Sequence, residues 1–157
     1  MANYYGTTDS IDGLRTLLAT HLNTLMTAMA TGYDPTFSYI YNYHIVAPLR
    51  LNAVTIGIGA GLTADMYGMD NGVGHEYDIP VELRVHTGYV GDTMDEQKIA
   101  RLIQSLDNYF NTHKSLGSNN ELMRTISIEP NRTFSESYTL GGSITFEVKL
   151  FINHVQA

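Results

Sequence analysis

The chain has 157 residues, of which 43% are hydrophobic and 16% are charged, and its formal net charge is −7 at pH 7. This length fits one domain, and the charged fraction lies below the ~25% of average soluble domains, which favours a surface partly covered by partner proteins. The acidic balance and the lack of adjacent lysines or arginines argue against a protein that grips nucleic acid by its phosphates, and the absence of cysteine excludes disulfides, a thiolate nucleophile and cysteine-bound zinc.

The chain is expected to begin with a polar arm, residues 1–9, followed by a helix that starts at Asp9 or Ser10 and ends at Gly32. An aspartate or serine side chain caps a helix by accepting a hydrogen bond from a backbone N–H of the first turn. The helix is predicted from apolar residues that recur at steps of three and four. They are Ile11, Leu14, Leu18, Leu22, Leu25 and Met29.

Two strands with a period of two are predicted next. Residues 36–45 place Phe37, three alternating tyrosines and Ile45 on one face, and residues 49–58 form a second strand with a bulge near Asn52. Six of the 14 glycines then lie in the segment Gly57–Glu76, which we expect to be a long flexible loop or an extended arm.

The second half of the chain is predicted to continue with a strand from Tyr77 to His86 and a helix capped by Asp92 or Thr93. A C-terminal meander follows, with strands at 122–128, 133–140 and 144–152. Residues 129–131 are its first turn, and Gly141-Gly142 supplies the positive φ angles of a tight hairpin.

The order α-β-β-β-α-β-β-β predicts a single α+β domain over residues 1–157. We expect a mostly antiparallel sheet with the helices packed on one face. The N-terminus has neither the basic start nor the apolar run of a signal peptide, and no segment approaches the ~20 apolar residues of a membrane span. A cytoplasmic protein without a membrane partner is therefore expected.

No combination of residues indicates an enzyme. Residues 57–61 contain three glycines and follow a predicted strand, as the loop of a dinucleotide-binding motif does. That motif also needs a helix directly after the loop, whose N-terminus holds the pyrophosphate, and no helix is predicted here. The six histidines lie on different elements without the spacing of a zinc-binding helix, and His75, Glu76 and Asp78 offer too few oxygens for calcium. No Gly-x-Ser-x-Gly motif is present. We therefore expect no catalytic residue, no cofactor and no metal.

The positive indication of function is the presence of Met66, Tyr67 and Met69 in the glycine-rich segment. One interpretation is that these side chains fold back on their own core. The other is that they pack on a neighbouring subunit, where methionine and tyrosine adapt well. We favour the second because the chain carries so little charge. Glu147 lies on the face of its strand opposite to Phe146 and is a further candidate for contact with a subunit or partner.

The pattern of elements resembles the tail-terminator and tail-completion proteins of tailed bacteriophages. The resemblance covers residues 10–155 and rests on the N-terminal helix, the strand at 77–85, the helix at 95–110 and the final segment 137–148. It implies a structural virion protein, assembled in the host cytoplasm, that forms a homohexameric ring. The ring would cap the tail tube protein and join it to the head-connector protein, with DNA passing through its lumen.

Two alternatives stay open at this point. One is a related head-tail connector or neck adaptor protein. The other is a small-molecule-binding or enzymatic α+β domain with a cleft under the segment 57–76.

Overall fold

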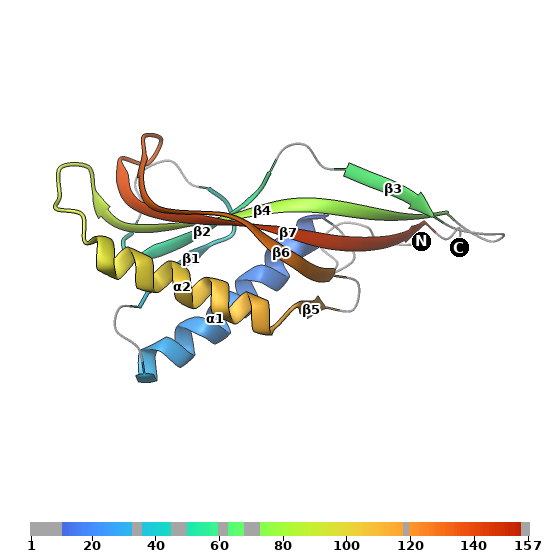
Figure 1. Cartoon of the computed structure of the whole chain (residues 1–157), viewed down its shortest axis with the longest axis horizontal. Coiled ribbons are helices and arrows are strands. Elements are labelled where there is room, and N and C mark those ends of the chain that lie inside the picture. The colour runs from blue at the N-terminus through green and yellow to red at the C-terminus, as the bar shows by residue number, and fades with distance from the viewer. Residues whose placement is uncertain are drawn as a thin grey trace.

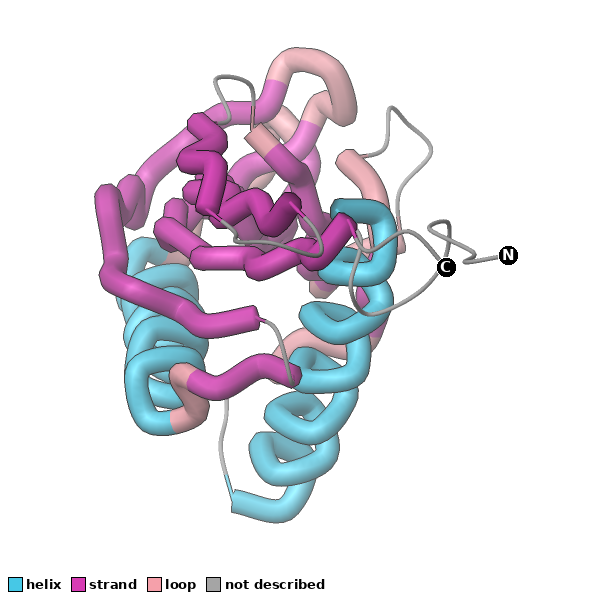
Figure 2. The backbone as a smooth tube through the Cα atoms, turned by 90° about the vertical axis from the view of Figure 1, so that its right-hand side faces the viewer, coloured by secondary structure: helices cyan, strands magenta, loops and turns pink. Residues whose placement is uncertain are grey.

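A computed structural model of the chain describes residues 11–32, 36–44, 50–59, 63–67, 73–117 and 120–154. These residues form two helices and seven strands, and both helices cover the same face of the one sheet (Figures 1 and 2). The elements are α1 (Ile11–Gly32), β1 (Tyr39–Tyr41), β2 (Ala53–Ile58), β3 (Thr63–Tyr67), β4 (Val73–Tyr89), α2 (Glu96–Thr112), β5 (Ser115–Gly117), β6 (Asn120–Phe134) and β7 (Thr139–His154). The chain is α+β, as the sequence predicts.

The sheet has the order β1-β2-β4-β7-β6-β5, and β3 pairs with β4 beyond the end of β2. The pairs are antiparallel except β1 and β2, which run parallel. The predicted order of elements is wrong in one respect, because four strands rather than three lie between the helices. The segment 57–76 contains β3 and the start of β4, which pair across residues 68–72; those connecting residues lie outside the described part of the chain.

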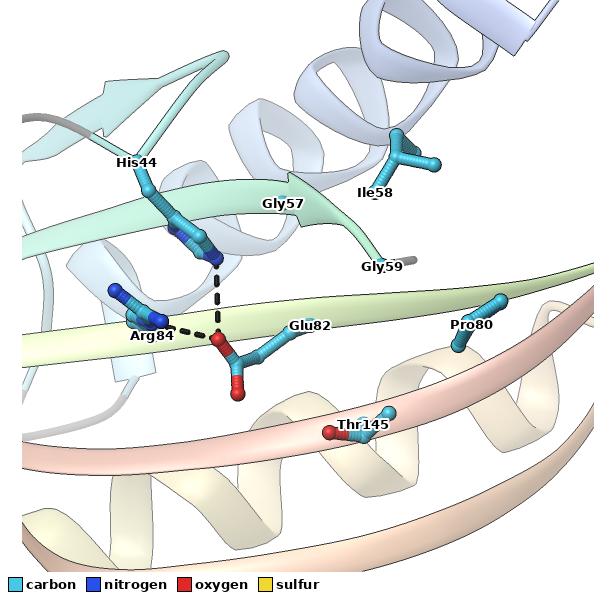
Figure 3. Close-up of a pocket in the computed structure, with 8 residues that line it drawn as sticks. All are labelled: His44, Gly57, Ile58, Gly59, Pro80, Glu82, Arg84 and Thr145. Carbon is cyan, nitrogen blue, oxygen red and sulfur yellow. Dashed lines mark hydrogen bonds and ion pairs between the residues drawn. The ribbon is translucent and has the colours of Figure 1, made fainter. Parts of the chain in front are cut away.

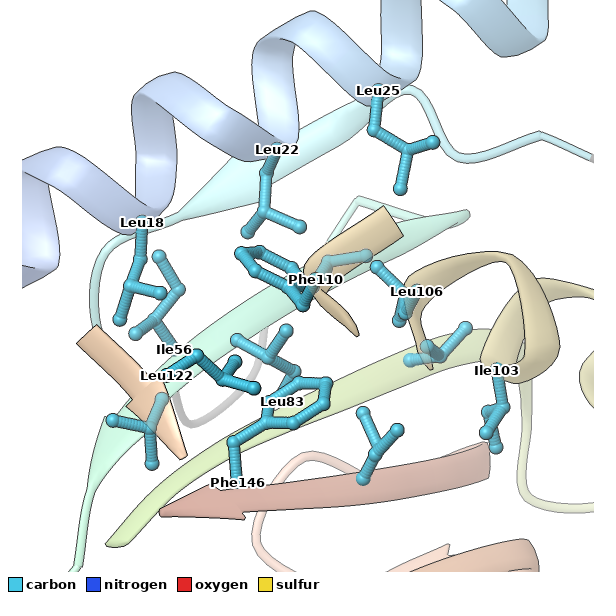
Figure 4. Packing of buried hydrophobic residues seen from close by; sticks show 14 of the residues in the cluster. Leu18, Leu22, Leu25, Ile56, Leu83, Ile103, Leu106, Phe110, Leu122 and Phe146 are labelled. Atoms are coloured by element: carbon cyan, nitrogen blue, oxygen red, sulfur yellow. The ribbon is translucent and has the colours of Figure 1, made fainter. Parts of the chain in front are cut away.

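The hydrophobic core lies between the helices and one face of the sheet (Figure 4). The predicted stripe of α1 is buried there, and α2 adds a second stripe that includes Leu106 and Phe110. Leu18 on α1 and Phe146 on β7 are both fully buried in this one cluster. The predicted packing of helices on sheet is therefore confirmed.

The sheet is longer than the helices that cover it. α2 and β4 each have 17 residues, but a helix of that length spans about 26 Å and a strand about 56 Å. As a result, one end of the sheet projects beyond both helices (Figure 1). We name this end the arm; it consists of β3, residues 73–76 of β4 and residues 151–154 of β7.

The aromatic strand predicted for residues 36–45 is much shorter in the structure, where β1 holds only Tyr39–Tyr41. After β1 the chain turns toward α1. The hydroxyl of Tyr43 donates to a carboxylate oxygen of Asp12 at 3.3 Å, and the guanidinium of Arg15 lies 4.4 Å from the centre of the Tyr43 ring. The alternating aromatic residues therefore serve two different contacts rather than one strand face.

Two further local predictions are wrong by a few residues. β2 begins at Ala53 and pairs with β4 in an unbroken register, so no bulge lies near Asn52. The cap of α2 is Asp95, whose side chain accepts from the backbone N–H of Lys98 at 3.1 Å. Asp92, one of the two predicted caps, instead accepts from a backbone N–H in the preceding turn.

The C-terminal meander differs most from the prediction. β6 runs through the expected turn at 129–131, with Pro130 in a bulge between Glu129 and Arg132. Proline has no backbone N–H to donate, so it is tolerated in a bulge or on an unpaired edge. Among the described residues, the outer edge of β6 pairs with no strand beyond Glu121. The turn lies at residues 135–138 instead.

Gly141 and Gly142 lie inside β7 and form no hairpin. They are needed because neighbouring atoms leave no room for a Cβ. A Cβ on Gly141 would overlap the carbonyl oxygen of Val85, and one on Gly142 would overlap the Ile103 side chain of α2 and the carbonyl oxygen of Glu129. The glycine pair thus lets β4, β6 and α2 approach the backbone of β7 closely.

Candidate functional site

The face of the sheet that the helices leave open carries a cluster of charged and hydroxyl side chains (Figure 3). Strand alternation on β4 sends Val81, Leu83 and Val85 into the core. The same alternation sends Glu82 and the residues at positions 84 and 86 to the open face. Side chains from four other parts of the chain meet them there.

Glu82 accepts hydrogen bonds from three basic side chains. Its Oε1 lies 2.6 Å from Arg84 Nε and 3.1 Å from His44 Nε2, and its Oε2 lies 2.8 Å from Arg132 Nη1. The hydrogen bond from His44 holds the pKa of Glu82 far below its usual range, with Arg132 and Arg84 adding to the effect and burial opposing it. The carboxylate is therefore ionised in the physiological pH range. It ties β4 to β6 and to the segment that follows β1.

Gly57 makes room for His44. β2 passes beneath the imidazole, and a Cβ on Gly57 would overlap the ring. The segment that carries His44 is held from its other side by α1, because Arg15 donates to the carbonyl oxygen of Asn42 at 2.7 Å and to that of Ile56 at 2.9 Å. His44 is therefore clamped between the first helix and the open face of the sheet.

A row of hydrogen bonds continues from His44 into the sheet. His44 Nδ1 lies 2.9 Å from Thr55 Oγ1, which lies 3.0 Å from His86 Nε2. His86 Nδ1 lies 2.6 Å from Thr139 Oγ1, which lies 2.7 Å from Ser137 Oγ. All but His44 are buried. Burial, helped by nearby positive charges, lowers the pKa of His86 to about 3, so this imidazole is neutral at physiological pH.

Phe134 closes one end of the cluster. It is buried, yet it lies outside the main hydrophobic cluster. The guanidinium groups of Arg84 and Arg132 lie 5.2 Å and 4.9 Å from its ring centre, and the ring of His86 lies 4.7 Å away. These cation–π contacts hold both arginines in place on either side of Glu82.

A pocket of about 370 Å³ opens beside Glu82. Its lining is formed by His44, Gly57, Ile58, Gly59, Pro80, Glu82, Arg84 and Thr145. Small-molecule sites usually measure roughly 300–1,000 Å³, so the size fits a small ligand. However, both oxygens of Glu82 already accept from protein donors, which leaves the carboxylate poorly suited to act as a general base. The site offers a rigid, ion-paired surface rather than a reactive group.

The described residues form no metal site. No three histidine, aspartate or glutamate side chains among them lie close enough together to hold an ion. Of the group weighed for calcium, Glu76 forms an ion pair with Lys149 across the pairing of β4 and β7.

The predicted contact residues lie away from this cluster. Met66 and Tyr67 fall in β3 and thus on the arm, but their side chains, and the whole of Met69, lie outside what the structure describes. Glu147 lies on the open face of β7, where its Oε2 accepts from Arg124 Nε at 2.9 Å. The structure therefore places three predicted contact residues without bringing Glu147 to the arm.

Sequence reasoning missed the Glu82 cluster. The alternation along residues 77–86 did place Glu82 and the two polar residues that follow it on one face. No local pattern shows that His44 and Arg132 join them. One usable signal was Gly57, because a glycine inside a strand marks a close approach by another group. Although it falls in the predicted strand 49–58, it was counted only as the first glycine of the segment 57–76.

No protein-family model matches the chain, and no curated protein matches its sequence. None of the described helices is long and apolar enough to span a membrane.

Proposed function

We propose that the protein is a structural component of a bacteriophage virion, a tail terminator. Its copies form a hexameric ring that caps the tail tube and joins it to the head connector. The observation that carries this proposal is the arm, an extension of the sheet that no described helix covers (Figure 1). Strands that project past their own core bury little apolar surface within the subunit, so such an extension is best explained by contact with another subunit.

The length of β4 supports this interpretation. A compact chain of 157 residues has a radius of gyration of about 15 Å, which corresponds to a sphere about 39 Å across. The 17 residues of β4 extend about 56 Å. A strand longer than the compact domain reaches beyond it. In a ring, that reach brings Met66 and Tyr67 against the next subunit.

β6 offers a second surface for assembly. Met123, Ile126 and Ile128 on this strand are 38%, 50% and 45% exposed. Three irregularities in the pairing of β6 with β7 distort the strand, and Pro130 removes one backbone donor from it. A neighbouring subunit therefore meets this edge by side-chain contact rather than by adding a strand.

The charge of the chain suits a ring through which DNA passes. With a net charge of −7, the ring repels phosphates and does not hold them. The isolated protein is expected to show no salt-dependent binding to duplex DNA.

Native mass spectrometry tests the ring, and the arm can be tested in the same experiment. We expect a hexamer, and we expect Met66→Asp/Tyr67→Asp to give monomers that keep the native circular dichroism spectrum because both residues lie on the arm. The matched control is Tyr89→Asp/Val90→Asp, which adds the same two charges at exposed positions at the other end of β4. A wild-type protein that is monomeric at every concentration contradicts the ring, and equal behaviour of the two variants contradicts the role of the arm.

The alternative of a neck adaptor shares the ring and the arm. Binding of the ring to isolated tail tubes favours the tail terminator, whereas binding to the head connector alone favours the adaptor.

The pocket beside Glu82 favours a different second candidate, a small-molecule-binding domain. Its lining includes Gly57, Ile58 and Gly59, at the start of the segment under which a cleft was expected. A thermal-shift screen of polar metabolites tests this candidate. A monomer whose melting temperature rises with a ligand, and no longer does so in Thr145→Val, would support it over the virion protein.

A further inference from the structure

The hydrogen bonds from Glu82 to Ser137 have a definite direction when His44 is neutral. An ionised carboxylate can only accept, so His44 Nε2 carries the hydrogen that is donated to Glu82. A neutral imidazole has one N–H, which leaves His44 Nδ1 bare. That nitrogen therefore accepts from the hydroxyl of Thr55 at 2.9 Å.

The direction continues through the buried side chains. Thr55 has a single hydroxyl hydrogen and has donated it, so its oxygen accepts from His86 Nε2 at 3.0 Å. His86 Nδ1 is then bare and accepts from Thr139, whose oxygen accepts in turn from Ser137. Every donor in the row points toward Glu82.

Protonation of His44 removes the acceptor that this arrangement needs. His44 Nδ1 then donates to Thr55, and the Thr55 hydroxyl is free to donate to His86 Nε2. His86 carries its single hydrogen on Nδ1 and donates to Thr139, which donates to Ser137. All the hydrogen bonds are kept. The one between His44 and Glu82 keeps its direction, and in each of the four others the donor and the acceptor exchange roles.

We infer that the five side chains form a relay in which protonation of His44, at the edge of the pocket, switches neutral His86 from its Nε2–H to its Nδ1–H tautomer. The relay takes up one proton in all. His44 gains it, while His86 and the three hydroxyl groups each keep one hydrogen.

The surroundings of the relay disfavour a proton on His86. His44 faces Glu82 and Arg84 of β4; Arg132 of β6 binds the other oxygen of Glu82, and Arg15 of α1 binds the backbone beside His44. The carboxylate offsets a positive charge on His44. Burial of His86 and the nearby charges of His44 and Arg84 lower its pKa to about 3. His86 therefore stays neutral over the range of about pH 5 to 8 in which histidines usually titrate.

The relay ends at an exposed turn on another part of the molecule. Ser137 is buried, but the next residue, Tyr138, is 67% exposed and has a φ of 54°, a region that a bulky side chain rarely adopts. Tyr138 accepts a backbone hydrogen bond from Val90 at 2.8 Å, and Val90 and Tyr89 are exposed beside it. The hydroxyl of Ser137 is one of the groups that support this strained turn. Reversal of the hydrogen bond between Ser137 and Thr139 therefore links a proton taken up at the pocket to an exposed aromatic surface.

Histidine ¹⁵N NMR of the full chain, recorded as His44 is titrated, tests the relay independently of ring formation. We expect the two ring nitrogens of His86 to exchange their bare and protonated chemical shifts, with the same midpoint as His44. Thr55→Val removes the linking hydroxyl and should hold His86 in one tautomer throughout. Thr55→Ser restores the hydroxyl and should restore the change.

Three results would overturn the inference. The first is a wild-type His86 whose tautomer stays constant while His44 titrates. The second is a tautomer change in Thr55→Val as large as that in the wild type. The third is a His44 that takes up no proton before the protein unfolds.

Discussion

Substituting Gly57 by alanine tests the placement of His44 most directly. The new Cβ would overlap the imidazole, and β2 cannot move aside because Gly57 pairs with Glu82 inside the sheet. The ring of His44 must therefore leave the open face. It then loses its hydrogen bonds to Thr55 and to Glu82.

The cost follows from these two hydrogen bonds. The one to Thr55 joins the imidazole to a hydroxyl group and contributes about 0.5–1.5 kcal/mol, and the one to the carboxylate contributes about 1.5–3 kcal/mol. Alanine restricts the unfolded chain, which offsets about 0.4–1 kcal/mol. The side chains of His44 and Glu82 are 25% and 23% exposed, so water replaces part of what is lost. We expect Gly57→Ala to lower the free energy of unfolding by about 1–2.5 kcal/mol.

Urea denaturation measures this change, and two further variants control it. Gly88→Ala makes the same substitution on β4, where the Cβ would meet only Asp92 atoms at 3.5 Å and 3.6 Å; it should cost within about 0.5 kcal/mol. In a His44→Ala background the obstructing ring is gone, so Gly57→Ala should no longer destabilise the protein. An equal cost with and without the ring would refute this reasoning.

Three other predictions concern the core, the glycine pair and acid stability. Leu18→Ala and Phe146→Ala should each cost about 2–5 kcal/mol in chemical denaturation, whereas Glu147→Ala on the open face should stay within about 0.5 kcal/mol; harmless core truncations would contradict the packing. Gly141→Ala should cost about 3 kcal/mol or more, seen as a lower melting temperature, because its Cβ overlaps a backbone oxygen that cannot rotate away; a fully stable variant would contradict the close approach. His86 has a pKa lowered from 6.5 to about 3 in the folded state, so the unfolded chain protonates first and stability falls as the pH drops below 6.5. From pH 7 to pH 5 the wild type should lose about 2 kcal/mol more than His86→Asn, and parallel losses would refute the shift.

Periodicity located the elements that have one buried face. The stripe of α1 and the alternation on β4 and β7 predicted which side chains face the core, because a one-residue slip would turn the apolar side chains to solvent, although β4 and β7 extend several residues beyond the predicted strands. The errors gather at glycine and proline. Pro130 and the pair Gly141-Gly142 were interpreted as turns, which is their commonest role. They lie in strands because of atoms that are distant in sequence: Val85 and Ile103 press on β7, and the outer edge of β6 needs no donor.

The cluster on the open face shows a similar limit. Alternation on one strand predicts which face Glu82 occupies, but not which side chains meet it there. His44 arrives after β1 and Arg132 arrives near the end of β6, and no local spacing relates them to Glu82. The arm was accessible to prediction for the opposite reason. Met66 and Tyr67 lie within one continuous glycine-rich segment, residues 57–76, which also supplies most of the arm.

The open face of the sheet divides into two parts that are stabilised in different ways. Around Glu82 the segment that carries His44 and the end of β6 fold over that face, and the hydrogen bond from His44 and the ion pair with Arg132 hold them there. This part is closed within one subunit, since Phe134 and His86 are buried there without a helix above them. Along the arm, no described element takes over that role. The sheet thus completes one half of its face internally and extends the other half past its core, and it is this second half that we propose a neighbouring subunit covers.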